Sequence, residues 1–206
     1  MSATGGTVFL LDDEPGMLKA LNRLLKAEGF TVRAFTSARA FVESYRQEVP
    51  SCLVLDVEMP ELNGLELQQR LTSTENPLPV IFLTGRGDVP MSVNAMKAGA
   101  IDFLTKPVKD VDLLQAVRFA LQRSAERHVV NSQVDSLRQR YSSLTPRECE
   151  VMALVVAGRL NKQIAAALGI VEHTVKVHRG RIMEKMSVNS LAELVRAAER
   201  LGRGNR

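Results

Sequence analysis

The sequence predicts two domains, an α/β domain followed by an all-α domain, joined by a helical segment. Strand-like apolar runs alternate with helical periodicity over about residues 5–124, and helical periodicity alone continues from residue 143. Residues 1–124 carry 13 Lys and Arg against 15 Asp and Glu, a net charge of −2. Residues 125–206 carry 14 against 8, a net charge of +6. Opposite signs favour two domains with different partners, and a basic half favours nucleic acid or a membrane surface.

The overall composition excludes several classes of protein. With 206 residues, 45% hydrophobic and 24% charged, the chain is long enough for one or two cores and is not mainly disordered. Cys52 and Cys149 form no disulfide framework, and we expect both to be buried reduced thiols. No run approaches the ~20 apolar residues of a membrane span, and residues 1–6 lack a signal-peptide pattern. We therefore expect a cytoplasmic protein without a membrane partner.

Five short apolar runs in the first half predict β-strands. Several are apolar without interruption, which is typical of strands buried on both faces. Because helical patterns separate them, we expect a parallel sheet with right-handed crossovers and helices on both faces, a (βα)₅ domain. The expected strands cover residues 7–11, 30–35, 51–56, 79–84 and 101–104.

The helices between these strands follow from apolar spacing. After Pro15, apolar residues recur every three or four positions until Gly29 stops the helix. A second helix is expected over about 37–48, and the last helix of the domain follows Pro107. The apolar positions of the first and last helices are Met17, Leu18, Leu21, Leu24, Leu25 and Val111, Leu114, Val117, Leu121.

Polar residues collect at one kind of position, the carboxyl end of a predicted strand: Asp12, Asp13, Asp56, Thr84 and Lys106. Ligands of open α/β sheets bind at this edge, so we expect these side chains to converge on one pocket. Three adjacent carboxylates repel one another, and Mg²⁺ with its preference for oxygen ligands relieves that conflict. One carboxylate can then attack a phosphoryl group, whose charge the cation and Lys106 balance and to which Thr84 donates a hydrogen bond.

Each of these residues also has an ordinary structural interpretation. A single Asp after a strand is usually a helix N-cap. Thr84 alone is a common strand-end hydroxyl, and Lys106 alone is a solvated surface lysine. The combination is specific because all its members lie at the same end of the sheet.

The set DDE…D…T…KP resembles the receiver domain of two-component response regulators over about residues 5–124. The resemblance implies a flavodoxin-like fold with parallel sheet order 2-1-3-4-5. It makes Asp56 the phospho-acceptor of a sensor histidine kinase. It also makes Asp12, Asp13, Asp56 and the backbone carbonyl of Glu58 the ligands of Mg²⁺ (or Mn²⁺).

The same resemblance implies a conformational switch. Thr84 and Lys106 act with Asp56 in the receiver's own phosphorylation and dephosphorylation, and no other enzymatic activity is implied. Phe103 occupies the aromatic switch position, where the family often has Tyr, so switching here rests on ring packing. A plain core role for Phe103 is the alternative. The Lys106-Pro107 bond resembles the family's cis peptide.

Residues 125–142 predict a helical linker because they contain no Gly or Pro. Val130, Val134, Leu137 and Tyr141 recur at steps of four, three and four. This seam fits a short coiled coil and equally a single amphipathic helix on its own domain. We thus expect a receiver over 5–124, a linker over 125–142 and a second domain over 143–206.

The second domain is expected to contain four helices. Thr145 and Glu148 form a capping box around Pro146, and the helix that they start runs to Gly158. Gly169 ends the next helix. Two short helices joined by a turn with Gly are typical of a helix-turn-helix. The remaining expected helices cover about residues 161–168, 172–186 and 190–201.

The helix over 172–186 is expected to bury Val175, Ile182 and Met186. Positions 174, 178, 181 and 185 share one polar, basic face that suits a major groove. A solvated amphipathic face is the alternative.

The segments LTPRECEV, NKQIAAALGI and HTVKVHRGRIMEKM resemble the LuxR-type helix-turn-helix of the NarL/FixJ regulators, over about residues 142–205. The resemblance implies a recognition helix over 172–185. Gly180 departs from good helix-forming sequence in its middle, at a cost of ~1 kcal/mol relative to Ala. The implied DNA contacts are Asn161, Lys162, Thr174, Lys176, Val177, His178, Arg179, Arg181 and Lys185.

The run MSVNAMKAGAIDFLTKP resembles the FixJ regulators in particular, with kin among regulators of aromatic-compound catabolism. It implies a phosphorylation-dependent transcriptional activator that dimerises through the face of about residues 88–104, binds promoter DNA and works with RNA polymerase.

Two other classes of protein remain open. A haloacid-dehalogenase-like phosphohydrolase also uses Asp, Thr and Lys on such a sheet, but it needs Asp at the position of Glu58 and a cap domain. A phosphoryl sink or protein-interaction module would not bind DNA, and salt-dependent heparin retention would separate it from a DNA-binding protein. Neither class explains both halves of the chain.

Overall fold

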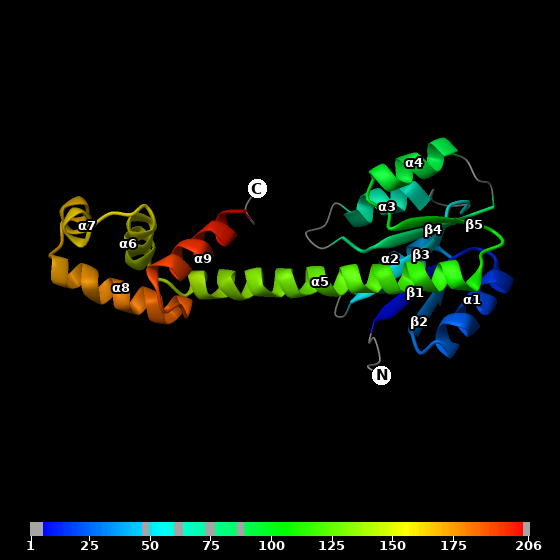
Figure 1. Cartoon of the computed structure of the whole chain (residues 1–206), viewed down its shortest axis with the longest axis horizontal. Helices are drawn as coiled ribbons and strands as arrows, with labels where there is room; N and C mark the ends of the chain where they lie inside the picture. Colours follow the sequence, from blue (N-terminus) through cyan, green and yellow to red (C-terminus); the bar gives the residue numbers. More distant parts are fainter. Residues whose placement is uncertain (1–5, 47–49, 60–63, 73–76, 86–88, 204–206) are drawn as a thin grey trace. The chain divides into compact units, whose positions relative to one another are not determined.

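The chain divides into two compact units, Met1–Val129 and Val130–Arg206, and each is described by itself (Figure 1). The structure is a computed structural model. It describes residues 6–46, 50–59, 64–72, 77–85 and 89–203.

The first unit is built on a five-stranded sheet in which all neighbouring strands are parallel. The order β2-β1-β3-β4-β5 confirms the predicted topology. In the register, Leu11 pairs with Leu55 and Thr84 with Thr105, so the carboxyl ends of the strands share one edge. The strands are β1 (Thr7–Leu11), β2 (Thr31–Phe35), β3 (Ser51–Asp56), β4 (Val80–Thr84) and β5 (Asp102–Thr105).

Helices cover both faces of this sheet (Figure 1). Val8 and Leu10 of β1 face α1 (Pro15–Ala27) and the first half of α5 (Asp110–Ser142). Phe9 and Leu11 face the opposite cluster, which includes Phe41. Because successive strand residues point to opposite faces and both faces are covered, β1, β3 and β4 are apolar except at their ends. The helices of the second face are α2 (Ala38–Ser44), α3 (Gly64–Thr72) and α4 (Val89–Lys97).

One helix is shorter than the sequence predicted. The expected helix over 37–48 is α2, which ends at Ser44, and residues 47–48 lie outside the described part of the chain. Tyr45 adopts extended backbone, with φ −67° and ψ 125°, and its ring packs 5.4 Å from that of Phe9. Tyr45 thus leaves the helix for the aromatic cluster of the core. The other strands and helices agree with the expected ranges to within a residue or two.

The expected linker is continuous with the last helix of the first unit. Helix α5 spans 33 residues, from Asp110 to Ser142, without interruption at Val129/Val130. In the expected seam, Leu137 packs against the core of the second unit, whereas Val130 is 57% exposed. The seam therefore packs on its own unit at Leu137, whereas Val130 and Tyr141 at its two ends are exposed by 57% and 41%.

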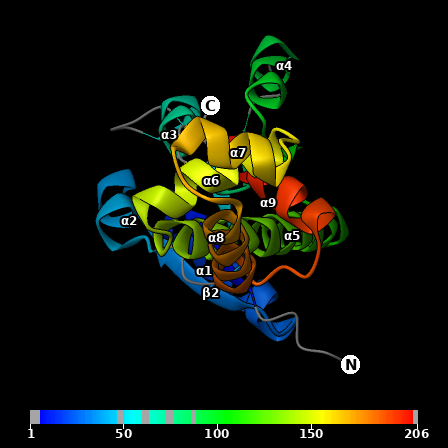
Figure 2. The same ribbon diagram turned by 90° about the vertical axis from the view of Figure 1, so that its left-hand side faces the viewer.

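The second unit is a cluster of short helices, coloured yellow to red in Figure 2. Thr145 caps the first of them, and the predicted capping box with Glu148 is present. Gly169 ends the second with a left-handed φ of +65°. Val175, Ile182 and Met186 are buried in the core of the unit, as expected. The helices are α6 (Pro146–Val156), α7 (Asn161–Leu168), α8 (Glu172–Met186) and α9 (Leu191–Arg203).

Both cysteines are free, and only one is buried as expected. Burial raises the pKa of the Cys52 thiol above its usual range. Cys149 is half-buried because α6 places it at the edge of its unit, where it lines a pocket of about 310 Å³ with Tyr141 and Leu201. Among the described residues, no helix is at once long and apolar enough to cross a bilayer.

Candidate functional site

Three carboxylates meet at the carboxyl edge of the sheet. Oxygen atoms of Asp12, Asp13 and Asp56 lie within 4.8 Å of one another. Asp12 and Asp56 are 1% and 5% exposed, and Asp13 is exposed. The predicted convergence of the ends of β1 and β3 is therefore confirmed, and the cluster opens to solvent on the side of Asp13.

Backbone hydrogen bonds orient the two buried carboxylates. Asp12 Oδ1 accepts from the backbone N–H of Glu14 at 2.8 Å, and Asp56 Oδ1 accepts from that of Glu58 at 3.2 Å. Such side-chain-to-backbone turns are typical of Asp directly after a strand. Each carboxylate therefore has one oxygen held by the chain and a second oxygen turned into the pocket.

Lys106 joins the two carboxylates. Its Nζ donates to Asp12 Oδ2 at 2.8 Å and to Asp56 Oδ2 at 3.0 Å. Burial by itself lowers the pKa of the ammonium, but the hydrogen bonds and charges of the two carboxylates outweigh burial and raise that pKa. Lys106 is therefore charged at neutral pH.

This donor set fits a divalent cation. Three carboxylates and one ammonium leave the pocket with a formal charge of −2, and the ligand atoms are carboxylate oxygens close together. Mg²⁺ prefers such oxygen ligands and is usually held by one or two carboxylates with water. Glu58, whose carbonyl is a further ligand by the receiver resemblance, lies two residues after Asp56 and is exposed.

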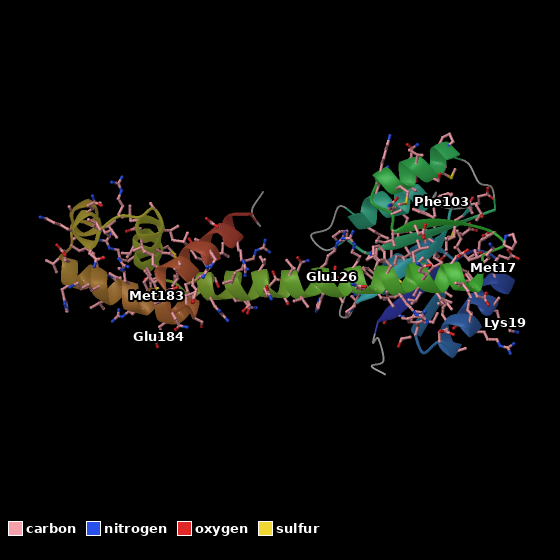
Figure 3. All side chains as sticks on the ribbon, viewed as in Figure 1. Met17, Lys19, Phe103, Glu126, Met183 and Glu184 are labelled. Carbon is pink, nitrogen blue, oxygen red and sulfur yellow. The ribbon has the colours of Figure 1, made fainter. Side chains whose placement is uncertain are left out.

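The remaining predicted receiver residues lie on β4 and β5, the two strands next to β3 on one side of the sheet. Thr84 ends β4 and is buried, and its backbone carbonyl accepts from the N–H of Lys106 at 2.7 Å. Phe103, labelled in Figure 3, is half-buried on β5 with its ring 6.0 Å from that of Phe82. The Lys106-Pro107 bond is cis, as expected. The structure thus brings the three carboxylates and Lys106 together at one edge of the sheet, with Thr84 at the end of the neighbouring strand.

A second candidate site lies on α8. Lys176, Val177 and Arg181 are exposed, with Val177 at 40%. Arg179 is half-buried, and its Nη1 donates to Oδ1 of Asn161 at 2.7 Å. This bond links α8 to the first residue of α7, so two of the predicted DNA contacts already lie side by side. Lys162, the next residue of α7, is exposed.

Lys185, a predicted DNA contact, is half-buried and already has partners within the second unit. Its ammonium lies 2.7 Å from Glu148 Oε2 and 3.2 Å from the carbonyl oxygen of Ser143, inside the second unit. Thr174 and His178 on the same flank are half-buried. One side of α8 carries positions 174, 178, 181 and 185. At the Lys185 end of α8, this side contacts α6 through Glu148. The Lys185 side chain is 34% exposed, and its DNA contact stays a prediction.

A more exposed surface of α8 includes Val177, a predicted DNA contact, and three residues that were not predicted to bind DNA. Opposite the buried residues lie His173, Val177, Gly180 and Glu184, all exposed and spaced four, three and four residues apart. We call these four residues the outward surface. The positions of Val175, Ile182 and Met186 point to it directly, because residues about half a turn away from a buried stripe face solvent.

Glu148 has a second role besides the predicted capping box, because it also pairs with Lys185. Hydrogen bonds from Lys185 and from the backbone of Thr145 lower the pKa of Glu148 to about 2. The capping box was visible in the sequence, but the partner from α8, 37 positions away, was not.

Two families account for most of the chain. Residues 8–118 match the response regulator receiver domain. Residues 142–198 match the luxR family of bacterial regulatory proteins.

Relatives similar over nearly the whole chain include two regulators and a nodulation protein. Nodulation protein W of Bradyrhizobium diazoefficiens is 46% identical, across 98% of this chain and 88% of the relative. Response regulator protein TodT of Pseudomonas putida is 44% identical with the same coverage. Transcriptional regulatory protein FixJ of B. diazoefficiens is 40% identical across 97% of both chains.

Two solved structures cover both units. Response regulator StyR is 48% identical, with a TM-score of 0.84 over 95% of this chain and 98% of that one. Full-length FixJ from B. japonicum is 40% identical, with a TM-score of 0.57 over 96% of this chain and 98% of that one.

Proposed function

This chain belongs to the two-component response regulators that join a receiver domain to a LuxR-type DNA-binding domain, and we propose that Asp56 is its phospho-acceptor. Proteins of this family regulate transcription under the control of phosphorylation. The observation that carries this proposal is the position of Asp56. It ends the central strand β3, is almost buried, and presents Oδ2 to Lys106.

The surrounding residues support a phosphoryl transfer from a sensor histidine kinase. The Asp56 oxygen forms the new P–O bond as the bond between phosphorus and the kinase histidine breaks. The ammonium of Lys106 balances the charge of the transferred group, and the Thr84 hydroxyl donates to one of its oxygens. Asp12, Asp13, Asp56 and the carbonyl of Glu58 would hold Mg²⁺ (or Mn²⁺), which supplies further charge neutralisation when bound.

The family is one of transcriptional regulators and not of catalytic enzymes. We propose no activity beyond phosphorylation and dephosphorylation of the chain itself. The phosphohydrolase alternative is disfavoured because Glu58 stands where that class needs Asp and already donates its backbone N–H to Asp56.

We propose that phosphorylation drives dimerisation through α4 and β5. Phosphoryl oxygens would draw in the Thr84 hydroxyl, and the half-buried ring of Phe103 would follow. Val93 and Met96 of α4 support an interface on this face, because both are large apolar residues exposed by 44% and 48%.

The same proposal assigns DNA contacts to the second domain. Lys176, Val177 and Arg181 contact the groove from the exposed part of α8, and Arg179 acts together with Asn161. Lys162 contacts the backbone, and Thr174 and His178 support the helix from its flank. A dimer places two such helices on one promoter, where RNA polymerase would be the further partner. We place this function in the cytoplasm, with the borders of the receiver, linker and DNA-binding domains at 124/125 and 142/143.

The test uses the full chain, acetyl phosphate and Mg²⁺. Light scattering measures dimerisation, and gel shift measures binding to DNA selected by the wild-type chain from a random pool. We expect dimerisation and tighter DNA binding, both abolished in Asp56→Asn and both retained in Asp112→Asn, an exposed carboxylate outside the pocket. Equal behaviour of the wild type and Asp56→Asn would overturn the proposal.

A further inference from the structure

We infer that Gly180 is a specificity-determining residue: its missing side chain lets the backbone of α8 approach the base edges of the major groove. This inference rests on the proposed DNA binding by α8. It goes beyond the family resemblance, which assigns the contacts to side chains and gives Gly180 no role.

Gly180 lies in the middle of the outward surface of α8. Val177 precedes it by one turn and Glu184 follows by one turn, and both are exposed. Figure 3 shows Glu184 on the side of α8 away from α6 and α7. A straight helix that presents this surface to a groove therefore brings the centre of its outward stripe, at Gly180, closest to the DNA.

The fold itself does not require glycine here. An ideal Cβ at Gly180 would meet no heavy atom of the described residues within 4 Å. Its φ is not in the left-handed region, unlike that of Gly158 or Gly169, which end helices. Alanine would therefore fit and would favour the helix, since glycine in a helix interior is destabilising.

The neighbours of Gly180 suit close contact with bases. Lys176 and Arg181 are exposed on either side of the stripe, where long cationic side chains reach phosphates on the two walls of the groove. Val177 offers an apolar surface one turn earlier. Between these side chains the backbone of α8 is uncovered, because Gly180 has no side chain. Proteins use glycine where the backbone approaches a ligand closely.

The experiment compares two glycine-to-alanine variants of the full chain. Gly202 on α9 is the matched control, because it is also helical and exposed, and an added Cβ there would meet none of the described atoms. Wild type, Gly180→Ala and Gly202→Ala are each treated with acetyl phosphate and Mg²⁺. Binding is measured on DNA selected by the wild type and on random-sequence DNA at low salt, together with the thermal midpoint.

We expect Gly180→Ala to keep or raise the thermal midpoint and to bind the selected DNA at least tenfold more weakly. Its affinity for random-sequence DNA should stay within twofold, because phosphate contacts carry that binding. Gly202→Ala should bind both DNAs like the wild type. The inference about Gly180 would be overturned, with the proposed function untouched, if Gly180→Ala bound the selected DNA as tightly as the wild type does. An equal loss of affinity for both DNAs would overturn it as well. A wild type that selects no sequence would overturn the proposed function as well.

Discussion

Lys185 of α8 donates a hydrogen bond to Glu148 of α6, with 2.7 Å between Nζ and Oε2, and the Glu148 side chain is 3% exposed. Lys185 also donates to the carbonyl of Ser143, just beyond the end of α5. In return, Arg140 of α5 donates to the carbonyl of Met186 at the end of α8. These bonds tie the ends of α5 and α8 together, and they account for the half-burial of a basic residue of the proposed recognition helix.

Replacing Lys185 with Met should lower the stability of the second unit. Met keeps most of the apolar stem but leaves the buried Glu148 carboxylate without its cation. The free energy of unfolding should fall by roughly 1–3 kcal/mol. Urea unfolding followed by circular dichroism measures this change. Lys176→Met, at an exposed position of the same helix, should leave the unfolding midpoint unchanged and weaken DNA binding; the reverse pattern would contradict the assignment of both lysines.

Acid should weaken the second unit through Glu148. Its pKa is lowered from an ordinary value of 4.5 to about 2, so its stabilising contribution is full above pH ~4.5 and is lost as the pH falls through about 2. Urea midpoints measured between pH 7 and pH 3 should therefore fall more steeply for the wild type than for Glu148→Gln. Parallel pH profiles for the two proteins would show that Glu148 is not the group responsible.

Lys106→Met should bind Mg²⁺ more tightly and accept phosphoryl groups more slowly. The ammonium lies within 3.0 Å of Asp12 and Asp56, so its loss raises the negative charge of the pocket that a cation meets. The same loss removes a cation that balances the phosphoryl group. Calorimetric titration measures Mg²⁺ affinity, and the rate of labelling by acetyl phosphate measures acceptance. Lys109→Met, exposed and outside the pocket, is the control; unchanged Mg²⁺ affinity in Lys106→Met would refute the electrostatic argument.

A charge on the exposed face of α4 should prevent dimerisation while phosphorylation continues. Val93→Asp or Met96→Asp would bury a carboxylate in the proposed apolar interface. The dissociation constant of the phosphorylated dimer, measured by analytical ultracentrifugation, should rise by at least tenfold. Val42→Asp, at a residue 53% exposed on α2, should dimerise like the wild type. Normal dimerisation of both α4 variants would place the interface elsewhere.

Much of the fold could be predicted because its signals are local. Continuous apolar runs marked β3 and β4, and the box between Thr145 and Glu148 marked the start of α6 to the residue. The departure of Tyr45 from α2 could not be predicted, because the ring leaves the helix to pack against Phe9, a contact with another strand.

Of the two candidate sites, the receiver pocket could be predicted from the sequence more fully than the DNA-binding face. The pocket residues could be found because each lies at the carboxyl end of a strand or just after it, and parallel strands bring their carboxyl ends together. On α8 the face expected from positions 174, 178, 181 and 185 is exposed only at Arg181, whereas the other three positions are half-buried. A helix turns about 100° per residue, so an error of one residue moves the expected contact face by more than a quarter turn.

By itself, the sequence determined two domains, a parallel sheet with a carboxylate pocket at one edge, and a helix-turn-helix with a basic third helix. Apolar periodicity and strand-end motifs carry that information within short stretches of chain. Only the tertiary structure decided that Lys185 pairs with Glu148 and that Gly180 lies at the centre of the outward surface. The physical reason is that Lys185 is placed by the buried Glu148 carboxylate, which a cation stabilises. Glu148 lies on α6, so the pairing depends on how α6 and α8 pack and not on the sequence near Lys185.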